Sequence, residues 1–149
     1  MAERLTITLI SDVCCAANAA EHLAARLADA SERGADLAVL PELACNPWSP
    51  ATRDARASDA EPLGGPRCSM QASASANAGI GLLGSAIIED TDGIRHNTAL
   101  LWDAGELVGT YRKHHLPDEP GFYETAHYEP APGGDRPAPL TFRGWSMGV

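Results

Sequence analysis

Apolar residues follow two different spacings in the first part of the chain. Over residues 5–10 they alternate with threonine in a short β-branched run, which is typical of a strand. Over residues 19–33 they recur three and four positions apart, so their side chains would share one face of a helix. Asn18 stands where a side chain can cap that helix, and Gly34 stands where helices commonly end. The pattern therefore predicts a strand followed by an amphipathic helix.

A continuous apolar run at residues 36–40 predicts a second strand, with both of its faces covered. Strand, helix and strand joined by tight connections form a βαβ unit, so we expect parallel neighbours in the sheet. Residues 46–66 are rich in proline and glycine and are predicted to form a long loop, which in compact domains often serves function. Residues 67–78 are rich in alanine and serine and predict a second helix, with Pro66 near its first turn.

Strands and turns alternate in the remainder of the sequence. The predicted strands are residues 79–89, 97–103, 107–111, 141–142 and 145–149, the last of them cut short. Asp92-Gly93 is a hairpin signal between the first two of these strands. Residues 113–136 are predicted to form a long loop. Because no internal repeat or domain linker is visible, we expect residues 1–149 to form one α/β domain with a mixed sheet.

Composition is that of a soluble protein and limits the partners to consider. Hydrophobic residues make up 44% of the 149 residues, and no run reaches the roughly 20 apolar residues of a membrane helix. The N-terminal residues lack the pattern of a signal peptide, so a cytoplasmic location is expected. Eleven basic against twenty acidic residues give a formal charge of −9, which argues against nucleic acid and membrane surfaces as partners.

The cysteines and histidines do not form metal-ligand patterns. Cys14 and Cys15 are adjacent, Cys45 and Cys68 stand alone, and no C-x-x-C spacing occurs. Since the chain does not look secreted, free thiols are expected rather than disulfides. The five histidines also lack metal-ligand spacing, so no metal site is expected.

A carboxylate ends the second predicted strand. Glu42 follows Leu40 and Pro41, and a charge at the end of a buried strand is costly unless it is paired or functional. Open α/β sheets place their sites beyond the carboxyl ends of their strands, where Glu42 is expected to lie. Glu42 is therefore a candidate catalytic residue, and the alternative is an exposed glutamate in a loop.

Lys113 and Glu124 form a second group of candidates. Lys113 leaves the strand predicted at residues 107–111, and Glu124 follows eleven positions later, after a segment stiffened by two prolines. A stiff loop that returns a carboxylate towards a lysine makes mutual control of their pKa values plausible. Taken singly, each could also be a solvated surface residue. The adjacent His114 and His115 are interpreted as ordinary loop residues.

These segments together resemble the nitrilase, or carbon–nitrogen hydrolase, superfamily. Pro41-Glu42-Leu43 resembles the segment that carries the general base of this family. Residues 97–99 (NTA) and 109–113 (GTYRK) resemble the hairpin that carries its catalytic lysine, and Lys113 and Glu124 have the family's spacing. The loop HLPDEPGFYE is most similar to that of N-carbamoylputrescine amidases and, less closely, of β-ureidopropionases. Three motifs in order carry the resemblance, which runs over about residues 5–149.

The resemblance implies both a fold and a chemistry. The fold would be a partial nitrilase-like α-β-β-α sandwich, with a mixed sheet and helices on one face. The chemistry would be hydrolysis of an amide or an N-carbamoyl amine, without a metal or an organic cofactor. Glu42 would take the proton of a cysteine thiol, Lys113 would stabilise the oxyanion, and Glu124 would hold Lys113 and the substrate in position.

The nucleophile is the point at which this sequence departs from the family pattern. The resemblance places that cysteine after a strand that would here follow residues 145–149, and none of the four cysteines occupies the equivalent position. Cys45, three residues after Glu42, would need a new geometry to serve. We therefore expect a single incomplete domain over residues 1–149, the N-terminal half of a carbon–nitrogen hydrolase truncated before the nucleophile strand, and inactive alone. The alternative is a non-catalytic binding or scaffold subunit with the same fold.

Half of such a sandwich would expose a sheet edge and an apolar face. We therefore expect the chain to associate with itself or with a complementary chain. A small amide or carbamoyl amine is the expected substrate of the complete enzyme.

Overall fold

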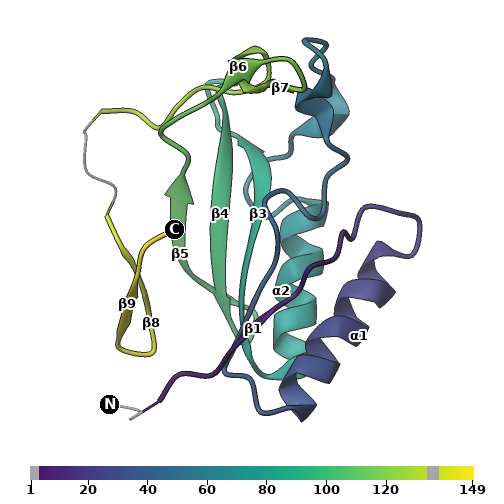
Figure 1. Cartoon of the computed structure of the whole chain (residues 1–149), viewed down its shortest axis with the longest axis vertical. Helices are drawn as coiled ribbons and strands as arrows, with labels where there is room; N and C mark the ends of the chain where they lie inside the picture. Colours follow the sequence, from purple (N-terminus) through teal and green to yellow (C-terminus); the bar gives the residue numbers. More distant parts are fainter. Residues whose placement is uncertain (1–3, 134–137) are drawn as a thin grey trace.

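A mixed five-stranded sheet carries two helices on one of its faces (Figure 1). The computed structural model describes residues 4–133 and 138–149. The sheet contains, in spatial order, β1 (Ile7–Leu9), β2 (Leu37–Val39), β3 (Gly81–Glu89), β4 (Arg95–Asp103) and β5 (Glu106–Arg112). The helices are α1 (Ala19–Glu32) and α2 (Pro66–Ala78). The prediction of an α/β fold, with a mixed sheet and helices on one face, is confirmed.

One half of the sheet is parallel and the other half is antiparallel. Strands β1, β2 and β3 are parallel, as expected of the βαβ unit, whereas β3, β4 and β5 form an antiparallel meander. Gly93 has a φ of 79° in the turn between β3 and β4, a conformation that glycine adopts without steric cost. The Asp92-Gly93 hairpin prediction is therefore confirmed.

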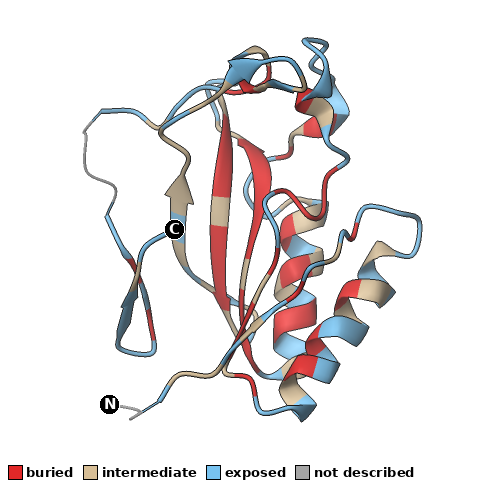
Figure 2. Cartoon of the chain, in the orientation of Figure 1, coloured by how far each residue is buried: buried red, intermediate tan, exposed pale blue. Residues whose placement is uncertain are grey.

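Alternate residues of each strand point to opposite faces of the sheet. On the helix-covered face, Leu82, Leu100 and Trp102 of the central strands share the main core with buried residues of both helices, and α2 packs directly on β3 and β4. Figure 2 shows the buried parts of these elements in red. The opposite face, here called the open face, carries Ile7, Leu9, Val39, Leu83, Ser85, Asn97, Ala99 and Tyr111. Strands β3 and β4 are covered most completely and form the centre of the sheet.

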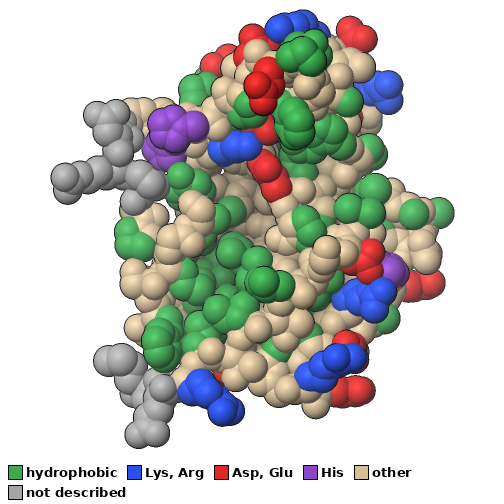
Figure 3. Space-filling model, viewed as in Figure 1, with side chains coloured by type: hydrophobic (Ala, Val, Ile, Leu, Met, Phe, Trp, Pro, Cys, Tyr) green, Lys and Arg blue, Asp and Glu red, His purple; other side chains and the backbone are tan. Residues whose placement is uncertain are grey.

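A hairpin covers part of the open face. Strands β8 (Leu140–Phe142) and β9 (Trp145–Met147) pair with each other and not with the five-stranded sheet. Phe142 packs over Gly81, where a Cβ atom would overlap its ring. Other parts of this face stay uncovered: Leu9 is 78% exposed, and Figure 3 shows apolar side chains gathered in a hollow with charged groups at its rim.

At the ends of the two helices, one of the three sequence predictions is wrong and two are confirmed. Asn18 makes no side-chain capping hydrogen bond, so its predicted role is wrong. Gly34, with a φ of 80°, follows α1 in the left-handed conformation that commonly ends helices. Pro66 is the first residue of α2, where its missing N–H costs nothing.

The two predicted loops contain short regular segments. Residues 46–66 include the 3₁₀ turns η1 (Ser49–Ala51) and η2 (Ala57–Asp59). The segment after β5 contains β6 (Asp118–Glu119), β7 (Phe122–Tyr123) and the 3₁₀ turn η3 (Glu124–Ala126), so it is more ordered than predicted. None of the helices in the described ranges combines the length and apolar character needed to cross a bilayer.

Candidate active site

Glu42 leaves the end of β2 at a backbone bend. The next residue, Leu43, is buried and has a φ of 51°, which is unusual for a residue with a side chain. Its N–H donates a 2.7 Å hydrogen bond to Ser85 Oγ, on the open face of β3. This bond holds the chain in a strained conformation, of the kind that functional sites often contain. The Glu42 side chain, 46% exposed, extends from the bend.

Lys113 follows directly after the end of β5. Its backbone N–H donates to the Asn97 carbonyl oxygen at 2.9 Å, which continues the β4–β5 ladder by one residue. Its Nζ lies 2.8 Å from Oε1 of Glu42, and 2.9 and 2.8 Å from Oε1 and Oε2 of Glu124. Lys113 therefore contacts both of the carboxylates that the sequence singled out. Glu42 lies 71 positions from it in the chain, and Glu124 lies 11 positions from it.

Glu124 is returned to the lysine by the small β6–β7 hairpin. Gly121, with a φ of 88°, makes the turn, and the Glu124 N–H donates to the Pro117 carbonyl oxygen at 3.1 Å. Its side chain is 1% exposed, so the carboxylate is buried against Lys113. A buried carboxylate is stable only when a cation or several donors compensate it, and Lys113 supplies that cation.

The loop before α2 supports this hairpin. Trp48 Nε1 donates to the Gly121 carbonyl oxygen at 3.0 Å, and its ring meets Phe122 edge-on with centroids 5.7 Å apart. Arg53 pairs with Asp118 at 2.9 Å. The hydrogen bond of Trp48 to the distant Gly121 could not be read from composition or spacing.

Electrostatics in the site favour a charged lysine. Burial alone would lower the pKa of Lys113, but hydrogen bonds to Glu124 and Glu42, and the charges of both carboxylates, outweigh burial and raise that pKa above 10.5. One ammonium between two carboxylates leaves the site one negative charge in excess when all three are ionised. The site therefore combines a lysine that stays charged near neutral pH with a half-exposed carboxylate.

A cavity of about 580 Å³ opens beside these groups on the open face. Its polar lining includes Glu42, Lys113, Asn97 and Ser85, and its apolar lining includes Val39, Leu83, Ala99 and Tyr111. His114 and His115 also border it, as do Gly148 and Val149 beyond the β8–β9 hairpin. An apolar cavity with a few convergent polar groups is the usual form of a small-molecule site.

The cysteines lie elsewhere. None of the four lines the cavity beside Lys113, and Cys45 instead borders a second cavity, together with Cys14 and Cys15. Burial raises the pKa of Cys45 to about 12 and that of Cys68 to about 11, so both stay protonated and weakly nucleophilic near neutral pH. Among the described residues, no group of three or more His, Cys, Asp or Glu side chains could hold a metal ion.

Two buried groups in the site were missed by sequence reasoning. Asn97 was noted only as part of the NTA motif, yet its Nδ2 donates to Glu42 Oε1 at 2.6 Å. Tyr128, 4% exposed, lies with its hydroxyl 3.5 Å from the same Nδ2. The signal for Asn97 was present, because a polar side chain in the middle of an apolar strand is costly unless it has a partner. Tyr128 follows a loop of no regular pattern and gave no such signal.

The chain has relatives among known proteins. The sequence profile of the carbon–nitrogen hydrolase family matches residues 13–149. No curated protein matches the chain. The fold is similar to that of a carbon–nitrogen hydrolase from Helicobacter pylori G27, at 24% identity and a TM-score of 0.79, over 91% of this chain and 47% of that one.

Two further solved structures widen the comparison. An amidase from Nesterenkonia sp. AN1, carrying acrylamide added at its active-site cysteine, matches at 24% identity and a TM-score of 0.72, over 96% of this chain and 55% of that one. A glutamine-dependent NAD⁺ synthetase from Acinetobacter baumannii matches at 19% identity and a TM-score of 0.64, over 93% of this chain and 25% of that one. The chain thus spans about half the length of the hydrolase and the amidase.

Proposed function

Because the chain belongs to the carbon–nitrogen hydrolase family, we propose that it supplies the Glu-Lys-Glu part of a site that hydrolyses a C–N bond in a small amide or N-carbamoyl amine. One observation carries the proposal: the Nζ atom of Lys113 lies within 2.9 Å of both Glu42 and Glu124, at the edge of an apolar cavity. Surface ion pairs seldom join three residues from separate segments around a 1%-exposed carboxylate.

The proposed reaction begins with a cysteine thiol that enters this cavity. Its S–H bond breaks as Glu42 takes the proton, and the thiolate forms a bond to the carbonyl carbon of the substrate. The C–N bond then breaks, and the proton held by Glu42 leaves with the amine or ammonia. Water attacks the resulting thioester, with Glu42 again taking the proton, and releases the acid and the thiol.

Lys113 and Glu124 have separate tasks in this scheme. The Lys113 ammonium faces the cavity and stabilises the negative oxygen of the tetrahedral intermediate; one such donor is typically worth about 10²–10³ in rate. Glu124, buried beneath it, keeps the ammonium charged and fixed in direction. Preorganised charge of this kind lowers the barrier without reorganisation during the reaction.

The thiol is proposed to come from a segment that reaches the cavity beside Gly148 and Val149, either on this polypeptide or on a complementary chain. The apolar surface around Ile7 and Leu9 is uncovered. This supports a segment that both supplies the thiol and covers the open face. A second copy of the chain is the other partner we expect on this surface.

The substrate class follows from the cavity and from the relatives. Its apolar walls suit a short carbon chain, and its polar end suits an amide group. The Nesterenkonia amidase takes acrylamide at its cysteine. The loop HLPDEPGFYE favours N-carbamoylputrescine as the more specific candidate.

The decisive experiment measures ammonia release by the protein purified from its native cells, at whatever length those cells make it. The substrates are acetamide, acrylamide and N-carbamoylputrescine. We expect thiol-dependent release that falls at least 100-fold in Glu42→Gln, whereas Glu106→Gln, an exposed glutamate on β5, leaves it unchanged. Release that survives Glu42→Gln would contradict the proposal.

A second function is favoured by one specific observation: no cysteine lines the cavity within the described residues. The chain would then be a non-catalytic binding or scaffold subunit of the same fold. In that case the native protein binds acrylamide or N-carbamoylputrescine, as measured by calorimetry, without releasing ammonia.

A further inference from the structure

Asn97 joins the two halves of the site through different atoms. It is 4% exposed on the open face of β4, opposite Ile87 of β3. Its carbonyl oxygen accepts the backbone N–H of Lys113 at 2.9 Å, and its Nδ2 donates to Oε1 of Glu42 at 2.6 Å. One residue thus fixes the main chain of the lysine and the side chain of the glutamate.

The neighbours of Asn97 determine which way its amide points. Nδ2 lies between two acceptors, the Glu42 carboxylate and the Tyr128 hydroxyl oxygen at 3.5 Å. Burial, and then the negative charge of Glu124, raise the pKa of Tyr128, so that hydroxyl remains protonated and neutral. The opposite amide orientation would set Oδ1 against a carboxylate oxygen, two acceptors with no proton between them. The amide is therefore held as a donor to Glu42.

The two oxygens of Glu42 consequently differ. Oε1 receives hydrogen bonds from Asn97 at 2.6 Å and from Lys113 at 2.8 Å. Among residues 4–133 and 138–149, none donates to Oε2, and the side chain is 46% exposed. An oxygen that already accepts two strong, charge-assisted bonds is a poorer proton acceptor than a free one.

We propose that Asn97 is a positioning residue for the general base: it and Lys113 occupy Oε1 of Glu42, so that Oε2 is the atom that takes the thiol proton. This assignment rests on the proposed role of Glu42 in C–N hydrolysis. It predicts that the nucleophile approaches Glu42 on the side of Oε2, the oxygen that neither Asn97 nor Lys113 occupies.

The alternative is that Asn97 only stabilises the fold. In that case its replacement would weaken the structure without changing how Glu42 and Lys113 respond to protons. Thr98 offers a matched control, because it is the next residue of β4, is equally buried, and its hydroxyl donates to the His96 carbonyl oxygen of its own strand.

Lys113 is the only lysine in the chain, so protein labelled with ¹³C-lysine gives a single side-chain NMR signal from the site. We would record that signal against pH for the wild type, Asn97→Leu, Asn97→Asp and Thr98→Val. The acid-side step marks protonation of the carboxylates that contact Lys113. In Asn97→Leu, which keeps the volume and removes the donor, this step should rise by about one pH unit.

Asn97→Asp keeps both size and polarity but places an acceptor against Glu42, so the step should rise at least as far. Thr98→Val should leave it within about 0.2 units, since no contact with the site is removed. A wild-type profile in both Asn97 variants would overturn the proposal. Because this measurement involves no catalysis, its failure is distinct from failure of the proposed hydrolysis.

A kinetic experiment uses the native protein and the substrate that it hydrolyses fastest among acetamide, acrylamide and N-carbamoylputrescine. Asn97→Leu should lower kcat about 10- to 100-fold while KM changes less than twofold, because the base is misoriented and the cavity is not. An equal loss in Thr98→Val, or an unchanged kcat in Asn97→Leu, would contradict a positioning role.

Discussion

At the scale of single residues, the site depends on a few buried polar groups that hold strained or charged neighbours. Leu43 stays in a left-handed conformation beside Glu42 because Ser85 accepts its N–H. Glu124 stays buried because Lys113 compensates its charge. In the first case a residue outside the catalytic candidates holds the bend, whereas in the second the candidates Lys113 and Glu124 stabilise each other.

Replacing Ser85 tests this dependence. Ser85→Ala leaves the buried Leu43 N–H without an acceptor, and we expect the free energy of unfolding in urea to fall by about 1–3 kcal/mol. Ser69→Ala removes an exposed hydroxyl that bonds to the Gly64 carbonyl oxygen, and it should cost less than about 0.5 kcal/mol. Equal effects of the two substitutions would show that the Ser85 bond contributes nothing special.

The residues of the site were predictable to different degrees. Glu42 and Lys113 could be found because each follows an apolar strand, where parallel and neighbouring strand ends converge. Ser85 and Asn97 could not be assigned roles, because their partners Leu43 and Glu42 follow β2 and meet them only through the register of β2 with β3 and of β3 with β4. Register is fixed by side-chain packing across the sheet, which a single sequence does not specify.

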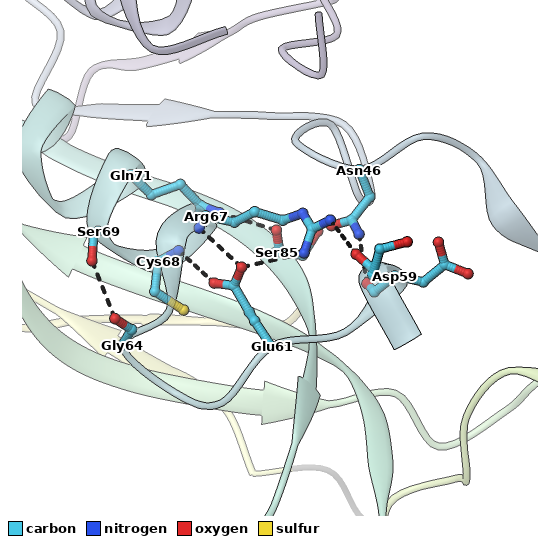
Figure 4. A network of polar contacts seen from close by, with 10 residues as sticks. Asn46, Asp59, Glu61, Gly64, Arg67, Cys68, Ser69, Gln71 and Ser85 are labelled. Carbon is cyan, nitrogen blue, oxygen red and sulfur yellow. Dashed lines mark hydrogen bonds and ion pairs between the residues drawn. The ribbon is translucent and has the colours of Figure 1, made fainter. Parts of the chain in front are cut away.

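At the scale of elements, the N-terminus of α2 is held by one buried acid (Figure 4). Glu61, 5% exposed, accepts the backbone N–H groups of Arg67 and Cys68 at 3.0 and 2.8 Å. The Arg67 guanidinium bonds to the same carboxylate at 3.2 Å and to the Ser58 carbonyl oxygen at 2.8 Å. A negative charge at a helix N-terminus is favourable, and here it also fastens the preceding loop to the helix.

Removing this carboxylate should destabilise the whole domain. Glu61→Ala leaves two helix N–H groups and a half-buried guanidinium without their acceptor, so we expect a loss of roughly 3–5 kcal/mol in the free energy of unfolding. Glu61→Gln keeps one oxygen as an acceptor and should lose about half as much. Urea unfolding followed by circular dichroism measures both. A smaller loss for the alanine variant than for the glutamine variant would contradict this account.

Prediction of elements was accurate where the hydrophobic period was strong. The helices at Ala19–Glu32 and Pro66–Ala78 and the five sheet strands were identified with small errors at their ends. The β6–β7 hairpin was not foreseen, because its two-residue strands are too short to show a period. Pairing of β8 with β9, apart from the main sheet, also depends on tertiary packing of Phe142 over Gly81.

At the scale of the whole molecule, buried thiols link stability to alkaline pH. Burial raises the pKa of Cys45 from 9.0 to about 12 and that of Cys68 from 9.0 to about 11. Above pH 9 the unfolded chain therefore binds fewer protons than the folded one. The free energy of unfolding should fall as pH rises from 9, until about pH 11 for Cys68 and about pH 12 for Cys45.

Urea titrations at pH 8, 9.5 and 11 test this link. Cys45→Ala should flatten the decline by up to about 1.4 kcal/mol per pH unit, whatever its effect at pH 8. Cys15→Ala, at an exposed position, should leave the slope unchanged. A slope that is the same in all three proteins would contradict the role of burial.

The central claim is that one lysine is held between two carboxylates, one buried and one half-exposed. The most direct test is the pKa of Lys113, read from its single labelled NMR signal in the wild type, Glu42→Gln and Glu124→Gln. We predict a wild-type pKa above 10.5 that falls in both variants, and further in Glu124→Gln because that carboxylate is 1% exposed and Glu42 is 46% exposed. A lysine that titrates identically in all three proteins would show that the three groups do not form one site.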